Sequence, residues 1–426
     1  ETPTPKAAVA SDRPVDAEAP TPTEPPEETE ASTALASQLD GLRLSEFFEV
    51  SFRALTVRSP ETVLSLGLTE PYGVTEVALD DISAAYQQET YAMVAEILET
   101  LESYDRAALS PEDQISYDVY HWYLSDQLAG RAYPYHTYPA TYFPPTAVHE
   151  DLIRFFTDLH PVDDLQDARD YVTRLRQVDT KIDQLIEGLE TRKRAGITPP
   201  DFAIQWAVYG SLGQFVGSRG RSNVLYTRLK EKVDPLSSGT PAEKQAALDD
   251  ALEAVEDVVL PAYRKLHDYL RDYPTYAQED SGFRRLPQGE EAYTYLLDHH
   301  TTTGLSAGEI HQLGLDELDR IHAEMRATFA TLGYPEDETL VQAYDRVARE
   351  GGRVSGNEVL TTYEALIAEA QQHLETAFDI RPQADVVVIG DQFGGFYIPG
   401  SLDGSRPGAF YANVGGVGEP YYAMRT

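Results

Sequence analysis

The sequence of 426 residues contains no cysteine. This absence excludes disulfide bonds, a thiol nucleophile and any metal site built from thiolate ligands. Basic residues are also scarce, because 34 lysines and arginines stand against 71 acids and give a net charge of −37. A field of this sign repels phosphate backbones and anionic lipid surfaces, which makes nucleic acid a poor candidate partner. A general role in solubility accounts for such a charge.

Long apolar runs and the common catalytic motifs are missing as well. No run approaches the ~20 apolar residues that a membrane-spanning helix needs. His149 is followed by Glu150, but Ile153 stands where the second histidine of a zinc-binding H-E-x-x-H motif belongs. There is no G-x-S-x-G nucleophile elbow, and the glycine loops lack the Lys-Ser/Thr pair of a phosphate-binding loop. The residues alone therefore assemble no complete catalytic site.

Residues 1–32 consist mainly of proline, threonine, alanine and acids, and they have almost nothing to bury. This composition predicts a disordered, extended tether. Such a stalk commonly links an exported domain to a membrane anchor, and a solubilising tail is the alternative. The sequence starts with glutamate rather than methionine, which indicates a processed or trimmed N-terminus.

A helical period dominates residues 33–380 and predicts one large helical body. Between 165 and 189, apolar residues recur at steps of three and four, which predicts a single long helix. Gly196 can provide the left-handed cap of this helix before two prolines. A second apolar stripe over 248–270 runs through Pro261, where we expect a kink or a break.

Capping residues mark the starts of further helices in this body. Ser110 precedes a proline and an acidic first turn, and Ser306 forms a capping-box pattern with Glu309. The helix after Ser306 should end at Gly333, and another helix is predicted over 357–378. The fold class is therefore predicted to be mainly α.

After residue 380 the helical period gives way to short strands. The segments 385–389, 395–399 and 409–414 are rich in β-branched or aromatic residues and are separated by glycine-rich turns. We predict that residues 381–426 form a small antiparallel sheet against the helical body.

The stretch "DGSRPGAFYANV" near the end of the chain is the strongest candidate for a site. Arg406 stands in a Gly-Ser-Arg-Pro-Gly frame and can present an always-charged fork to a carboxylate. The strand after it could pair its edge with an extended peptide. The alternative is that Arg406 pairs with Asp403 or another acid to pin a turn, and that Phe410 and Tyr411 are half-buried strand residues.

Several stretches resemble a known family from about residue 40 to the end. They are "YFPPTAVHEDLIRFF", "DARDYVTRLRQVDTKIDQLIEGLETRKRAGITPP", "LPAYRKLHDYLRDY", "LPQGEEAYTYLLDHHTTTGLSAGEIHQLGLDELDRIHAEM" and "DGSRPGAFYANV". In this order they resemble the bacterial family catalogued as domain of unknown function 885. The histidine-containing block over 292–325 and the arginine-strand block are the most specific parts of this resemblance.

The resemblance implies a helical fold similar to the enclosed-cleft peptidases carboxypeptidase Taq, neurolysin and angiotensin-converting enzyme. It also implies a zinc-dependent peptidase that acts on short peptides, exported to the periplasm or cell surface and held by a lipid upstream of Glu1. In the family, a helix with the motif H-E-A-x-P-G-H-H follows the arginine strand and is expected to bind the zinc. Here the sequence stops at Thr426, so we expect the metal ligands beyond it and this chain alone to be inactive.

By the same resemblance, Arg406 should orient a substrate carboxylate or carbonyl near the metal, with Tyr411 and Asn413 as weaker candidates. The partners of the protein would be a peptide substrate and its own C-terminal segment as a separate chain. The main alternative is a non-catalytic helical protein of the cell envelope that binds peptides or interacts with other proteins. A helical-barrel glycosidase that relies on scattered acids ranks below both.

Overall fold

The computed structural model describes residues 27, 29–141, 147–276, 282–380, 382, 384–391, 395–415, 419–420 and 424. Within them the protein is mainly α-helical with a small sheet late in the chain, as the sequence predicted. Most of the predicted tether, residues 1–32, lies outside the described residues. The first helix begins at Glu30, where Thr29 and Ser32 form a capping box.

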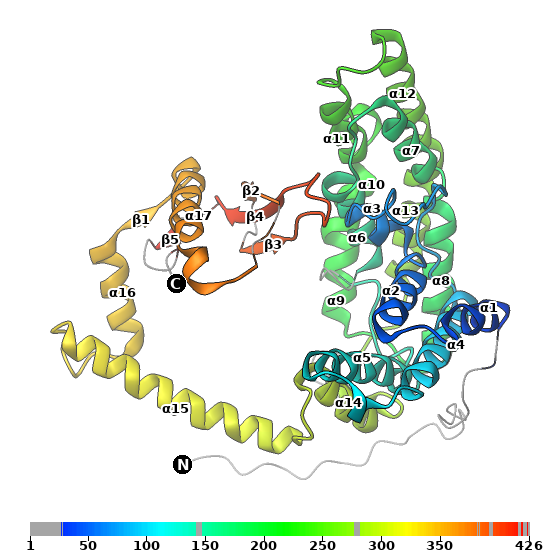
Figure 1. Ribbon diagram of the computed structural model, residues 1–426. Coiled ribbons are helices and arrows are strands. Elements are labelled where there is room, and N and C mark those ends of the chain that lie inside the picture. The colour runs from blue at the N-terminus through cyan, green and yellow to red at the C-terminus, as the bar shows by residue number, and fades with distance from the viewer. Residues whose placement is uncertain are drawn as a thin grey trace.

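The first part of the chain forms a small N-terminal lobe with a core of its own (Figure 1). Its helices are α1 (Glu30–Leu39), α2 (Leu44–Thr56), α4 (Ala84–Glu102) and α5 (Pro111–Gly130). Phe47 of α2 is fully buried at its centre, against Ile97 and Leu101 of α4. The short helix α3 (Pro60–Ser65) follows α2 and contacts the main body.

The main body is a bundle of helices around the largest core. Its helices are α6 (Val148–Arg154), α7 (Leu165–Leu175), α8 (Val178–Arg194), α9 (Asp201–Trp206), α10 (Leu212–Gly217), α11 (Val224–Val233), α12 (Pro241–Ala254) and α13 (Leu260–Arg271). Tyr171 and Tyr263 are fully buried, and their hydroxyls donate to the backbone carbonyls of Leu225 (3.0 Å) and His149 (2.7 Å). Helix α14 (Gly289–Thr301) then packs against α5 of the N-terminal lobe.

The predicted single helix over 165–189 is wrong, because two helices, α7 and α8, meet there at Arg176 and Gln177. At this break the Gln177 amide nitrogen donates to the carbonyl of Val77 (2.8 Å), and its oxygen accepts the N–H of Leu79 (3.0 Å). The apolar stripe continues through both helices, so its spacing could not reveal the break.

The sequence predicted a kink or a break near Pro261, and the structure has a change of helix type there without an interruption of the helix. A π-helical turn, Val255–Val259, separates α12 from α13, and Pro261 lies in the first turn of α13. Proline has no N–H to donate, and the π-helical turn just before it is the local change in helix type at this position.

The predicted helix caps are also confirmed. The side chain of Ser110 accepts the N–H of Asp113 at the start of α5, and Ser306 and Glu309 form a capping box. Gly196 follows α8 with a φ of +72°, the left-handed conformation that glycine adopts without strain.

Beyond the body the chain continues into an arm and a C-terminal module (Figure 1). The arm consists of the long helix α15 (Ala307–Thr331) and α16 (Leu340–Gly351), and none of the residues of α15 is buried. The module contains α17 (Asn357–Ala377), and a short antiparallel pair, β1 (Arg353–Val354) and β5 (Glu419–Pro420), lies beside it.

The module's sheet has three strands in the order β2-β4-β3. They are β2 (Val386–Asp391), β3 (Phe396–Ile398) and β4 (Gly408–Asn413). The predicted purely antiparallel sheet is wrong, because β4 pairs parallel with β2 and antiparallel with β3. β4 takes the central position because its residues are mostly buried, and Phe410 packs against Tyr363 of α17.

In the described part of the chain, no helix has both the length and the apolar character required to cross a membrane.

Candidate functional site

The loop that carries Arg406 is the point where the C-terminal module meets the body (Figure 1). The Arg406 guanidinium donates from Nη2 to the carbonyl of Ser65 (3.0 Å), and the N–H of Leu402 donates to the carbonyl of Leu66 (2.9 Å). Ser65 is the last residue of α3, so the guanidinium lies at the negative end of that helix. Asp403 instead accepts from the N–H and hydroxyl of Ser405 (3.0 and 2.8 Å). Arg406 therefore contacts α3 through its side chain.

Tyr411 lies in the same junction and is 8% exposed. Its ring stacks on Phe396 with a centroid distance of 4.5 Å. Burial, and then the charge of Asp158 and a hydrogen bond to it, raise the pKa of Tyr411 to about 12. The hydroxyl is therefore protonated near neutral pH and attached to the body.

Asn413, the third predicted residue, lies at the far end of β4, where its Oδ1 accepts the N–H of Gly415 (2.9 Å). The backbone of β4 does not offer the free edge that the sequence suggested. Residues 409–411 are paired with β2 on one side and with β3 on the other. The prediction of an open strand edge is wrong for these three residues.

A partly buried lysine that sequence reasoning missed lies at the same junction. Lys232 of α11 donates from Nζ to the carbonyls of His160 (2.7 Å) and Phe156 (3.3 Å). Burial, opposed by the charge of Asp158 and assisted by those of Arg228 and Arg406, lowers the pKa of Lys232 to about 8. Because its N–H groups reach backbone carbonyls after α6, this lysine stabilises the contact between α11 and that turn.

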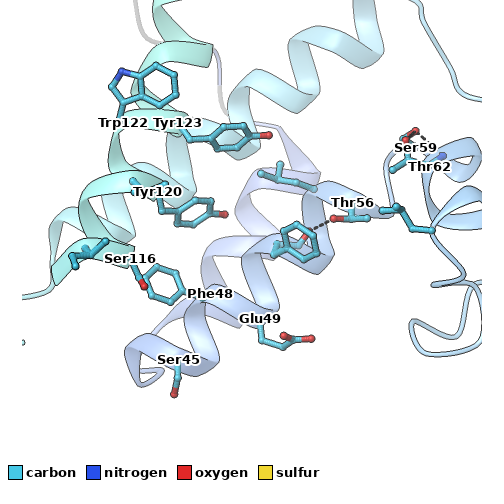
Figure 2. A pocket seen from close by; sticks show the side chains of 15 residues that line it. Ser45, Phe48, Glu49, Thr56, Ser59, Thr62, Ser116, Tyr120, Trp122 and Tyr123 are labelled. Atoms are coloured by element: carbon cyan, nitrogen blue, oxygen red, sulfur yellow. Dashed lines mark hydrogen bonds between the residues drawn. The ribbon is translucent and has the colours of Figure 1, made fainter. Parts of the chain in front are cut away.

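An apolar groove lies elsewhere, between α2 and α5 of the N-terminal lobe (Figure 2). Its volume is about 990 Å³, near the upper end of the range typical for ligand sites. Large apolar side chains form most of the lining: Phe48, Phe52, Ile115, Val119, Tyr120, Trp122 and Tyr123. Ile115 and Val119 are 67% and 62% exposed, so the groove is an open patch. Contiguous apolar patches of this kind mark interaction sites in soluble proteins.

The two helices of the groove are held together at its floor. The hydroxyl of Tyr120 donates to Ser51 Oγ (3.0 Å), and its ring packs edge-on against Phe48 at 5.6 Å. Figure 2 shows Phe48, Tyr120 and Tyr123 projecting from the two facing helices. Because these contacts fix the helix spacing, the lining residues are positioned before any ligand binds.

The groove was missed from the sequence although α5 carries a signal for it. One stripe of α5, with Tyr117 and Leu124, is buried in the lobe. A second stripe, with Ile115, Val119 and Trp122 at steps of four and three, is exposed on another face. A helix that is apolar on two faces has more apolar surface than one core can bury, which indicates a second partner.

Two further cavities, lined by both polar and apolar side chains, follow the groove along the boundary between the lobe and the body. The first, of about 490 Å³, shares Leu55 and Ser59 with the groove. The second, of about 350 Å³, shares Gln127 and Arg192 with the first. Shared lining residues show that the three spaces adjoin one another in series.

The last cavity contains a histidine–carboxylate pair. His299 of α14 lies with Nδ1 at 2.7 Å from Oδ2 of Asp126 of α5. The Tyr295 hydroxyl donates to the backbone carbonyl of Asp126 (3.2 Å). These contacts connect α14 to the lobe, and the partly exposed ring of His299 lines the cavity.

The described residues do not fit a zinc ion. Among them, no group of three or more histidines, aspartates and glutamates is placed to hold a metal. His149 is fully buried, and burial lowers its pKa to about 4. Its ring is thus neutral near pH 7, and its 3.5 Å approach to Glu150 Oε1 is not an ion pair. His160 accepts from Arg174 (3.0 Å) within the core, so both histidines are packing residues of the body.

Residues 60–426 match the model of a bacterial family of proteins of unknown function, DUF885. The fold is similar to that of a candidate lipoprotein from Colwellia psychrerythraea, with a TM-score of 0.74 and 20% identity over 93% of this chain and 70% of the other. It is also similar to a candidate lipoprotein of unknown function from Shewanella oneidensis, with a TM-score of 0.54 and 16% identity over 90% and 67%. No curated protein matches the sequence.

Proposed function

The chain belongs to the bacterial family DUF885, and from that premise we propose that it forms the helical body and peptide-binding groove of a zinc-dependent peptidase acting on short peptides. The groove between α2 and α5 is the observation that carries the proposal. It is open and lined by aromatic and aliphatic side chains, which suits the apolar side chains of an extended peptide. The described residues do not fit zinc, so in this proposal its ligands belong to other residues of the complete protein.

A second function, peptide binding without hydrolysis, is favoured by one observation. The described residues bring together no metal-binding group, whereas the groove is complete within α2 and α5. A protein of this kind would capture peptides in the cell envelope and leave their cleavage to other enzymes.

The location of the protein is part of the proposal. Two proteins with this fold are candidate lipoproteins, which supports a cell-envelope protein. We place it in the periplasm or at the cell surface, held by a lipid upstream of Glu1. A C-terminal segment of the same protein, as a separate chain, is the partner that would bring the zinc ligands.

The experiment that tests the proposal is a binding titration of the 426-residue chain with a fluorescent, uncharged octapeptide of alternating leucine and phenylalanine. Val119→Asp places a charge in the middle of the groove and should weaken binding about tenfold or more, because burying an unpaired carboxylate costs at least ~1.4 kcal/mol. Val341→Asp, at an exposed valine of α16, is the matched control and should bind as the unchanged chain does.

Mass spectrometry of the same peptide after incubation with zinc and the complete protein, which includes the C-terminal segment, separates the two functions. Cleavage that a chelator abolishes supports the peptidase, and binding without cleavage supports the binding protein. Equal affinity of Val119→Asp and the unchanged chain would remove the groove from both.

A further inference from the structure

The groove between α2 and α5 has one charged residue in its lining, and that residue is acidic. Glu49 of α2 is exposed and forms no ion pair with the described residues. Figure 2 shows its carboxylate beside Phe48 at the α2 side of the groove. Among the described residues, no lysine or arginine lines the groove. The groove therefore combines an apolar surface with a negative charge in its lining.

A second acid extends this pattern on the opposite helix. Glu112 lies in the first turn of α5, one turn before Ile115 and Ser116, which line the groove. It is exposed and likewise has no ion pair with the described residues. Glu49 and Glu112 thus place negative charge on both helices of the groove.

The basic residues near the groove offset these charges only in part. Arg43 is held by Glu46 (2.6 Å), and Arg106 is held by Asp118 in a two-bonded fork (both contacts 2.6 Å). Arg53 of α2 donates to the carbonyl of Tyr72 (2.7 Å). Arg43 and Arg106 are thus paired with acids, whereas Arg53 keeps its charge one turn after Glu49 and offsets part of it. The groove is therefore bordered by two acids and one arginine that form no ion pair with the described residues, within a chain of net charge −37.

Aromatic rings strengthen the preference for a positive charge. The faces of tryptophan and tyrosine attract ammonium and guanidinium groups through their quadrupoles. Trp122 and Tyr123 are 39% and 45% exposed in the groove, so their rings are accessible to a ligand. An apolar peptide with lysine or arginine at intervals could place its aliphatic side chains on Val119 and its cations near the rings and Glu49.

We propose that the natural ligands of the α2–α5 groove are cationic peptides, in which apolar residues alternate with lysine or arginine. This inference rests on the proposed peptide-binding function and specifies its substrate class. Anionic peptides of the same apolar content are rejected, because their carboxylates meet Glu49 and Glu112 without any basic partner in the groove. The arrangement gives selectivity by charge, with the apolar lining supplying most of the affinity.

The test uses two fluorescent nonapeptides with identical apolar residues that differ only at two positions, lysine in one and glutamate in the other. Exposed charge contacts are each worth roughly two- to fivefold in affinity, so the lysine peptide should bind about tenfold more tightly at low salt. The ratio should shrink as the salt concentration rises, because exposed charges are screened within about 10 Å at 0.1 M.

Variants of the chain identify the source of the selectivity. Glu49→Gln should reduce the lysine-to-glutamate affinity ratio by about two- to fivefold, and Glu49→Gln with Glu112→Gln should bring it close to one. Glu99→Gln, at an exposed acid of α4, is the matched control and should leave the ratio unchanged. Affinity for the uncharged leucine–phenylalanine peptide should stay the same in all of them.

The outcomes that overturn the inference differ from those that overturn the proposed function. Equal binding of the lysine and glutamate peptides sinks the charge selectivity but leaves peptide binding in place. Binding of none of the three peptides removes the proposed function and the inference with it. Light scattering that shows a dimer, lost in Val119→Asp, assigns the groove to a second copy of the chain and also overturns the inference.

Discussion

The helical body and the arm that follows it contain similar residue types but bury them very differently. In the body, Leu175, Ile182 and Leu266 are completely buried. In the arm, α15 buries none of its 25 residues, and Leu313 and Leu318 are about half exposed. The body is therefore stabilised by its core, whereas α15 depends on its capping box and on contacts between neighbouring turns.

Ion pairs show the same difference on a smaller scale. In the body, Lys181 contacts Glu61, and both side chains are largely buried. Burial raises the pKa of Glu61, while the Lys181 charge opposes that change. In α15, Arg320 contacts Glu317 (2.7 Å) and Glu324 (2.8 Å), but its side chain is half exposed. The charged groups are in close contact in both cases, and their exposure to solvent determines how much each ion pair contributes to stability.

Removing the buried lysine should have the largest effect on stability. Lys181→Met leaves the Glu61 carboxyl buried without its partner and should lower the free energy of unfolding by about 3–5 kcal/mol. Arg320→Met, the matched change in α15, should cause no measurable loss, because solvent already screens its contacts. Denaturant unfolding at pH 7 measures both variants.

The double variant Lys181→Met with Glu61→Leu sharpens this test. It replaces the pair by apolar side chains and should recover most of the stability lost in Lys181→Met. Equal losses in Lys181→Met and Arg320→Met would contradict the distinction between the two regions.

The pH dependence of stability should also differ between the regions. His149 in the body has a folded-state pKa of about 4, below the ~6.5 of an unfolded chain, so the unfolded state binds its proton first on acidification. The contribution of the neutral, buried His149 to the free energy of unfolding is thus complete above pH ~6.5 and is lost as the pH falls toward 4.

In His149→Leu, the slope of the free energy of unfolding against pH should be smaller by about 1.4 kcal/mol per pH unit between pH 6 and 4.5. The control is His311→Leu, at an exposed histidine of α15, which should keep the slope of the unchanged chain. Unfolding curves at several pH values measure these slopes. The same slope in the two variants would show that His149 is not buried as a neutral ring.

The smallest expected effect lies where the module touches the body. Arg406→Ala removes the donor to Ser65 and should destabilise the docking of residues 396–413 by roughly 1–2 kcal/mol. Arg406→Lys keeps the charge at the end of α3 but loses the guanidinium fork, so its docking stability should lie between that of the unchanged chain and that of Arg406→Ala. Hydrogen exchange of β3 and β4 measures the docking locally.

The same variants test the predicted substrate role of Arg406. Binding of the leucine–phenylalanine peptide should be unchanged if Arg406 serves only as an anchor, since the groove lies between α2 and α5. A loss of activity in the complete protein without a loss of docking would favour the substrate role. Unchanged hydrogen exchange in both variants would contradict the anchor.

The sequence predicted those parts of the fold whose causes are local. The capping residues Ser110 and Ser306 and the glycine cap at Gly196 are confirmed because each acts within a few residues. The irregularity expected near Pro261 is present as a π-helical turn rather than a break. The break between α7 and α8 was missed, because the partners of Gln177 lie about a hundred residues earlier in the chain.

The sheet and the site were harder for the same reason. β4 lies between β2 and β3, and strand order depends on tertiary packing that periodicity does not report. Arg406 was identified as a special position, but Ser65, which it contacts, is 341 residues away in sequence. The groove was missed because the exposed stripe of α5 resembles ordinary core residues when only the sequence is known.

Helix α15 has a mechanical consequence. At 25 residues it is a rod about 37 Å long, which starts after Thr302 with its left-handed φ of 53°. The module at its far end returns to the body through Arg406 and Leu402, so the assembly is a beam supported at both ends. Cutting one support turns the beam into a cantilever, in which a rotation of about 5° at Thr302 displaces the tip of the rod by about 3 Å. The hydrogen bonds at α3, together with the contact of Tyr411 with Asp158, therefore set the position of an entire module from one corner.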